Sequence, residues 1–280
     1  MKNALLFLPI ALAVMLAGCN LEKEVDIKLP ETQERIVVEC YLEPGAPINL
    51  LLTRTSGYFD PIPEDNLAFL NQTLVNGATV VIRSETGESY TLDNNLVFNQ
   101  FTKKIFNYTS HLVAPIERGK TYSLEITLEN GDLITASTSI LPVVPIDSVV
   151  VEFNDTDTLA RVLTYLTDRP NEDNYYRRMI QHSSLDTIPD QDFTTDDRFV
   201  EDVIVFGTPY DYGRGDTVIN TIFHIEKAYF DFLESVQLAI ASNGNPFAQP
   251  SPIISNVQGP NAMGIFTGLS YDRVVSFLPD

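Results

Sequence analysis

Short segments in which apolar and polar residues alternate fill most of the chain after residue 34. RIVVECYL (35–42) and INLLLTRT (48–55) flank a turn that contains Pro44 and Gly45, which is typical of a β-hairpin. A second hairpin is predicted from ATVVIRS (78–84) and ESYTLDNN (88–95). The clearest hairpin signal is Glu129-Asn130-Gly131 between two further alternating runs, 121–128 and 132–140. Short strands at this spacing predict an antiparallel β-sandwich.

The segment Leu141-Pro142-Val143-Val144-Pro145 interrupts this pattern with two prolines, which cannot donate to a central ladder. We therefore place a domain boundary there. Further strands follow in DSVVVEF (147–153), ARVLTYLTD (160–168), NYYRRMIQH (174–182) and 218–225. The predicted fold is mainly β, with two antiparallel β-sandwich (Ig-like) domains, at 35–141 and 146–280.

One segment of the second domain has the period of a helix. Tyr229, Leu233, Val236 and Ile240 recur at helical spacing, and Asn243-Gly244 follows as a stop. This pattern predicts a single amphipathic α-helix near 227–242. Such an apolar stripe more often packs on the protein's own sheet than on a membrane.

The first eighteen residues differ from the rest of the chain. Lys2, an apolar run and small residues before a cysteine predict a secretory signal peptide (1–18) that is too short to span a membrane. Leu16, Ala17, Gly18 and Cys19 match a bacterial lipobox, in which the cysteine thiol receives a diacylglycerol with acyl chains such as palmitate. Cys19 is therefore the predicted lipidation site. The alternative is an ordinary secretory signal that happens to end near a cysteine.

The charged residues 19–34 then form a lipidated tether between the membrane and the fold. Two or three acyl chains hold a protein stably in a bilayer, because each buried methylene contributes about 0.8 kcal/mol. The predicted location is the outer membrane, on either its surface or its periplasmic side. Cys40 has no other cysteine left to pair with, and we expect it to fill a strand position.

The 38 acidic and 18 basic residues give a net charge of −20, which argues against nucleic acid as a partner, since phosphates need a basic patch. The chain contains no HExxH, GxSxG, P-loop or GxGxxG motif. These patterns favour a protein that is not an enzyme and holds no cofactor. Acidic loop residues are weak calcium candidates, although none matches an EF-hand loop and solvated loops explain them better: Asp155, Asp157, Asp190, Asp192, Asp196 and Asp197.

Four aromatic residues in turn-like segments are candidates for ligand binding: Tyr58, Phe59, Tyr210 and Tyr212. The other interpretation is that these side chains close their own loops. The sequence does not identify the ligand, whether a small molecule, a glycan or a peptide.

Several segments resemble a Bacteroidota lipoprotein family of unknown function, the domain of unknown function family 4249. They include RIVVECYLEPG, LPVVPIDSV and the C-terminal run NGNPFAQP (243–250) with Ile254-Ser255-Asn256-Val257. Members of such families are commonly encoded beside TonB-dependent receptors of the outer membrane. The resemblance implies an accessory role in nutrient capture, with such a receptor as partner.

Three hypotheses follow. The first is a membrane-anchored, non-catalytic binding component of a TonB-dependent uptake system. The second is an extracellular hydrolase that uses carboxylates or calcium, and the third is a structural or adhesive surface lipoprotein. A β-sandwich fits all three, and the resemblance favours the first.

Overall fold

The computed structural model describes residues 33–57, 61, 63–100, 102–156, 158–167, 169, 172–198, 202–243 and 251–280. The chain divides into Met1–Thr32 and one compact unit, Gln33–Asp280, to which all described residues belong. In that described part no helix has the length and apolarity needed to cross a bilayer. The predicted signal peptide, lipobox and Cys19 lie outside the described residues.

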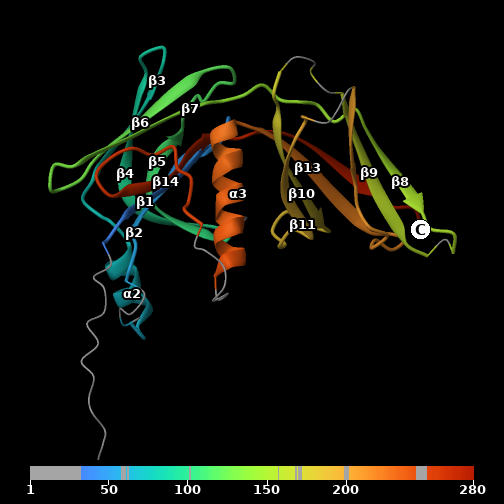
Figure 1. Ribbon diagram of the computed structural model, residues 1–280, viewed down its shortest axis with the longest axis horizontal. Helices are drawn as coiled ribbons and strands as arrows, with labels where there is room; N and C mark the ends of the chain where they lie inside the picture. Colours follow the sequence, from blue (N-terminus) through green and yellow to red (C-terminus); the bar gives the residue numbers. More distant parts are fainter. Residues whose placement is uncertain are drawn as a thin grey trace, which may run out of the picture. The chain divides into compact units, whose positions relative to one another are not determined.

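The unit is built from three β-sheets, as Figure 1 shows. The largest has eight strands in the order β14 (Ala262–Gly268), β1 (Ile36–Leu42), β2 (Pro47–Arg54), β5 (Lys104–Val113), β4 (Ser89–Asn99), β3 (Thr79–Ser84), β6 (Thr121–Thr127) and β7 (Leu133–Ser139). The second has the order β11 (Gln191–Asp196), β10 (Tyr175–His182), β13 (Thr217–Ile225) and β15 (Ser270–Phe277). The third has the order β12 (Val203–Gly207), β9 (Ala160–Thr167) and β8 (Ser148–Phe153).

The eight-stranded sheet coils so that its two edge strands, β7 and β14, approach each other. Asn256 lies between these edges: its Nδ2 donates to Phe266 O at 2.7 Å and Ser137 O at 3.3 Å, and its Oδ1 accepts from Phe266 N at 3.0 Å. The alternating residues of the strands fill the interior, where Leu50, Ile82 and Leu124 are almost completely buried. The sheet thus encloses one apolar core.

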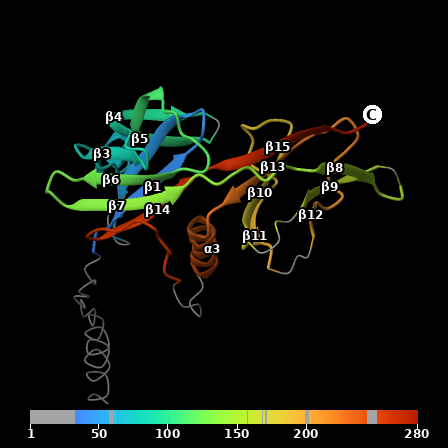
Figure 2. The same cartoon turned by 90° about the horizontal axis from the view of Figure 1, so that it is seen from above.

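Strand β14 connects the first sheet to the second. It pairs in parallel with β1, with Val38 opposite Gly264, whereas the neighbouring pair β1–β2 is antiparallel. Only Leu269 separates β14 from β15, and Figure 2 shows the two as one continuous segment (red). The division into domains at 35–141 and 146–280 remains a prediction, but a strand of the predicted second domain belongs to the first sheet.

The two smaller sheets enclose a second core. Every second residue of β9 points inward, including Val162 and Leu166, and meets inward residues of β10 and β13 such as Tyr176 and Ile222. If only one face of β13 were covered, strict alternation would bury four or five of its nine residues, yet eight are buried. Its opposite face is therefore also covered.

Helix α3 (Lys227–Ser242) supplies that cover. Tyr229, Phe230 and Leu233 pack with Phe223 of β13 and Ile265 of β14, so the helix lies against both the four-stranded sheet and the eight-stranded sheet. The carboxylate of Glu226, which precedes the helix, accepts from Ser139 N at 3.0 Å and from Thr138 Oγ1. The start of the helix is thereby fixed to β7.

The mainly β fold with antiparallel sheets and one packed amphipathic helix is confirmed. The predicted apolar stripe of α3 packs on the sheet at Tyr229, whereas Ile240 is 70% exposed. The last turn of the helix extends beyond the strands that cover its first turns. Cys40 fills a fully buried position of β1, as expected, and burial raises the pKa of its thiol.

Candidate functional site

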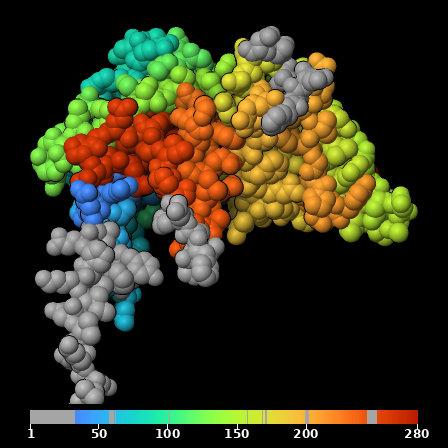
Figure 3. All heavy atoms as spheres, viewed as in Figure 1, coloured from blue at the N-terminus to red at the C-terminus, as the bar shows by residue number. Residues whose placement is uncertain are grey.

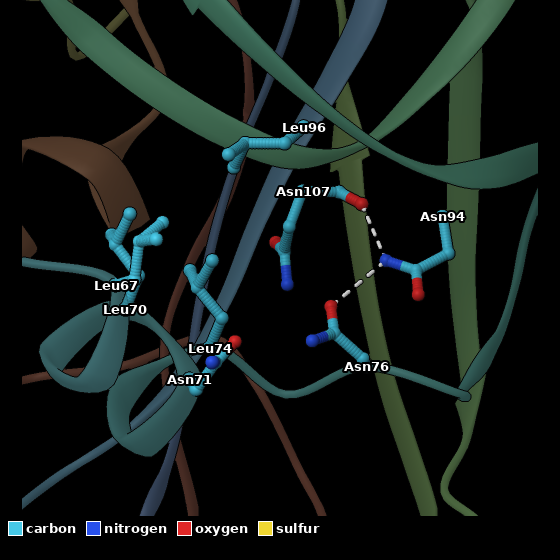
Figure 4. A pocket seen from close by; sticks show the side chains of 8 residues that line it. All are labelled: Leu67, Leu70, Asn71, Leu74, Asn76, Asn94, Leu96 and Asn107. Atoms are coloured by element: carbon cyan, nitrogen blue, oxygen red, sulfur yellow. Dashed lines mark hydrogen bonds between the residues drawn. The ribbon is translucent and has the colours of Figure 1, made fainter.

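A pocket of about 350 Å³ opens at one end of the eight-stranded sheet. Figure 4 shows Leu67 and Leu70 of helix α2 (Asn66–Thr73) with Leu74 on one side, and the amides of Asn76, Asn94 and Asn107 on the other. The lining residues are Leu67, Leu70, Asn71, Leu74, Asn76, Asn94, Leu96 and Asn107. The pocket therefore combines an apolar wall with a wall of uncharged hydrogen-bonding groups.

Helix α2 forms the apolar wall. Asp65 caps its N-terminus, because its Oδ1 accepts from Leu67 N at 3.2 Å, and Leu74 N donates to Leu70 O at 2.8 Å at the other end. None of its residues is buried, and Leu67 and Phe69 are 69% and 43% exposed. The sequence analysis missed this helix. The spacing of Leu67, Leu70 and Leu74 after a capping aspartate was the signal that could have found it.

Asn107 is the buried member of the asparagine side of the pocket, which also includes Asn76 and Asn94. The residue is 1% exposed, and its Oδ1 accepts from Leu52 N at 2.8 Å. Its Nδ2 donates to Leu52 O at 3.0 Å and Val75 O at 2.8 Å. This side chain therefore takes the place of backbone pairing between β2 and β5 at Leu52, and it adds to the backbone pairing that holds the segment after α2 on β2.

Asn94 extends the wall toward the opening. Its Nδ2 donates to Asn76 Oδ1 at 3.0 Å and Asn107 O at 2.8 Å, as the dashed lines in Figure 4 mark. The register of β4 on β5 shifts between Asn94 and Val97, which adds one residue to β4. Such a bulge redirects a side chain, and here Leu96 lines the pocket although it is 53% exposed.

The described lining residues carry no charge, so they offer hydrogen bonds and apolar contact. Asn71 and Asn76 are exposed, and their amides add donors and acceptors at the surface. This arrangement fits an uncharged group that has both polar and apolar parts.

Of the aromatic candidates, Tyr210 and Tyr212 do not line this pocket. Tyr58 and Phe59 lie outside the described residues. Tyr210 is 37% exposed, and the guanidinium of Arg161 lies 5.2 Å from its ring centroid. Tyr212 is 3% exposed, and burial raises its pKa to about 12. Tyr212 thus packs in the core between the two smaller sheets.

The described acidic candidates take part in different interactions. Asp192 forms an ion pair with Arg177 at 2.6 Å, and Asp196 one with Arg198 at 2.6 Å. Asp197 is buried and accepts from the backbone N of Asn174 at 2.9 Å. The remaining candidates are Asp155 and Asp190, which are exposed, and Asp157, which lies outside the described residues. Among the described residues no three His, Cys, Asp or Glu side chains form a group that could hold a metal ion.

The family model described as "Domain of unknown function (DUF4249)" matches residues 22–274. No curated protein matches the chain. Among solved structures, a cytokine receptor complex is 10% identical over 85% of this chain and 94% of that chain, with a TM-score of 0.26. A pullulanase from Anoxybacillus sp. LM18-11 complexed with maltotriose is 11% identical over 67% of this chain and 24% of that chain, with a TM-score of 0.22.

Proposed function

The chain belongs to the family described as Domain of unknown function (DUF4249), and from this premise we propose that it is a lipid-anchored binding protein of the outer membrane. In this proposal it captures a ligand without chemical turnover and assists a TonB-dependent receptor. The lipobox Leu16-Ala17-Gly18-Cys19 supports the anchor. The resemblance to lipoproteins encoded beside such receptors supports the partner.

The observation that carries the proposal is the position of Glu34 and Arg35 beside the pocket. Glu34 forms an ion pair with Arg54 at 3.2 Å, and Arg35 O accepts from Thr55 N at 2.9 Å. Leu74, at the end of α2, forms a β-bridge with the adjacent Thr53. The first described residues and the pocket helix therefore flank the same end of β2, which Figure 1 and the space-filling view in Figure 3 also show.

Exposed apolar side chains gather at this end of the sheet. Leu67 and Phe69 belong to α2, and Leu96 and Phe98 lie where β4 approaches its turn, with exposed fractions of 43–69%. We name these four residues the apolar rim. An extended chain from Cys19 to Gln33 spans at most about 50 Å. A lipid on Cys19 would thus keep the pocket and its rim close to a membrane, where a receptor also lies.

The anchor is tested by metabolic labelling with a fatty-acid analogue. We expect wild-type protein and Cys40→Ala to be labelled, because Cys40 is buried in β1. Cys19→Ala should lose the label and leave the membrane fraction. Label that remains on the Cys19→Ala protein would overturn the anchor.

The partner is tested by affinity capture from detergent-solubilised outer membranes. The wild-type protein should recover a TonB-dependent receptor, and the double variant Leu67→Gln and Phe69→Gln should recover less of it. A matched variant, Leu133→Gln, changes a residue that is 49% exposed on β7 and should behave like wild type. If no receptor is captured and deletion of the gene leaves uptake of every tested nutrient unchanged, the proposed function is wrong.

A further inference from the structure

Two adjacent arginines of β10 point to opposite faces of the four-stranded sheet and have opposite surroundings. Arg177 lies under α3, where it forms a bidentate pair with Asp192 (2.7 and 2.6 Å) and donates to Tyr229 Oη at 2.8 Å. Arg178 points between the two smaller sheets and is 0% exposed. Only the first of these guanidinium groups has a carboxylate partner among the described residues.

The partners of Arg178 are all neutral. Its Nε donates to Asn220 Oδ1 at 3.4 Å, and its Nη1 donates to Gln191 Oε1 at 3.2 Å and Gly207 O at 3.0 Å. Its Nη2 is buried and has no hydrogen-bond partner in the described part of the chain. Nε and Nη2 form one donor edge of the guanidinium. On this edge Nε makes one long hydrogen bond and Nη2 makes none in the described part of the chain.

This arrangement costs free energy. A buried charge without a counter-charge loses its hydration, and neutral dipoles replace only part of it. Desolvation lowers the pKa of Arg178 to about 10, so the group still carries its charge at neutral pH. Although the chain has 38 acidic residues, none of those described forms an ion pair here. The charge of Arg178 therefore has no counter-charge among the described residues.

The surroundings of the guanidinium indicate a route of entry. Phe193 lies on β11 and Phe206 on β12, with ring centroids 6.0 and 5.7 Å from the guanidinium carbon and 6.2 Å from each other. These two strands are the edges of their sheets. Phe193 is 36% exposed and lies opposite Arg178 in the register of β10 and β11, so its ring faces both the guanidinium and solvent. A rotation of this ring would open the site without breaking a β-ladder.

We propose that Arg178 is a binding site for the carboxylate of a small organic acid with an apolar body. The carboxylate accepts from Nη2 and Nε, as two parallel hydrogen bonds to one guanidinium edge. The apolar body lies against Phe193 and Phe206. A single cation between two aromatic rings matches a monoanion, whereas a phosphate dianion would need a second cation. The site is distinct from the leucine and asparagine pocket and does not depend on the proposed function.

The first test measures thermal unfolding of the whole protein in sodium benzoate, with sodium chloride and sodium phosphate at the same ionic strength as references. Wild type should gain about 2–4 °C in Tm at saturating benzoate and less in phosphate. Arg178→Met should lose this gain and should melt no lower than wild type without ligand, since replacing an uncompensated buried charge by an apolar side chain is often neutral or stabilising. Arg177→Met, on the other face, should keep the gain.

Equal benzoate shifts in wild type and Arg178→Met, or no shift in wild type, would overturn the proposal, and a larger shift in phosphate would overturn the carboxylate assignment. A second measurement is independent of the folding of Arg178→Met. The chain has no tryptophan, so Phe193→Trp introduces a single fluorophore at the entrance. Its emission should change saturably with benzoate, and a change that is linear or equal in chloride would count against the site.

Discussion

Gly264 is the residue at which β14 approaches β1 most closely, and its replacement by alanine should be strongly destabilising. Its φ is +127°, a conformation that alanine rarely adopts. An added Cβ would overlap the carbonyl oxygen of Val38 and lie 2.8 Å from the backbone C and N of that residue. Ser255 Oγ also bonds both Gly264 N and O at 2.9 Å, so the glycine cannot move away freely.

Two contributions set the expected loss in free energy of unfolding for Gly264→Ala. A non-glycine residue at such a φ costs roughly 1–3 kcal/mol. Displacement of packed neighbours costs about 1–3 kcal/mol more. Gly87 is a matched control, because its φ is +97° and nothing lies within 4 Å of an added Cβ. Gly87→Ala should therefore show the first term alone.

The assay is urea unfolding followed by far-ultraviolet circular dichroism. We expect Gly264→Ala to lose at least about 2 kcal/mol more in free energy of unfolding than Gly87→Ala. Failure of Gly264→Ala to fold, while Gly87→Ala folds, is the same result in a stronger form. If the two variants differ by less than about 0.5 kcal/mol, the close approach of β14 to β1 is not rigid and the reasoning is refuted.

Three further predictions concern buried polar groups. Asn107→Ala leaves Leu52 and Val75 backbone groups unpaired and should lower the free energy of unfolding by about 2–4 kcal/mol, whereas the exposed Asn71→Ala should stay within about 0.5 kcal/mol of wild type in urea unfolding. Tyr229→Phe removes the oxygen that accepts from the Arg177 guanidinium and should cost about 1–2 kcal/mol in the same assay; no loss would mean that this bond adds nothing to the pair with Asp192. Burial raises the pKa of Glu226 above its usual value of about 4.5. Between the unfolded and the folded pKa, the folded state holds a proton that the unfolded chain has released. The free energy of unfolding should therefore fall as pH rises through this range. Glu226→Gln should lack this slope in unfolding measured from pH 4 to 7, and an unchanged slope would assign it to another group.

The local pattern of the chain predicted the elements that are stabilised by neighbours in sequence. The hairpin around Pro44 and Gly45 and the hairpin around Asn130-Gly131 are present as β1–β2 and β6–β7. Phe223 and Ile225 of the predicted strand 218–225 are buried together in the cluster that contains Tyr229 of α3. Turn chemistry and side-chain alternation act over a few residues, so these features can be inferred from sequence.

Features that depend on distant pairing could not be inferred in this way. Nothing near residues 262–268 indicates that they pair in parallel with 36–42, because the partner lies more than 200 residues away. The pocket depends on a similar contact, since Asn107 meets Leu52 from the other end of a long connection. By contrast, the pair Arg177-Arg178 in a predicted strand was enough to predict a buried arginine. Strand alternation places one of two adjacent arginines on each face, and one of those faces had to be internal.

The position of β14 has a consequence for the order in which the protein can fold. During synthesis, seven strands of the largest sheet leave the ribosome before residue 140, but the edge of β1 has no partner until residues 262–268 emerge. An unpaired strand edge is a template for association with other chains. The nascent protein therefore spends more than half of its synthesis with that edge open, and a chaperone that covers IVVECYL over this interval would protect it until its own last strands arrive.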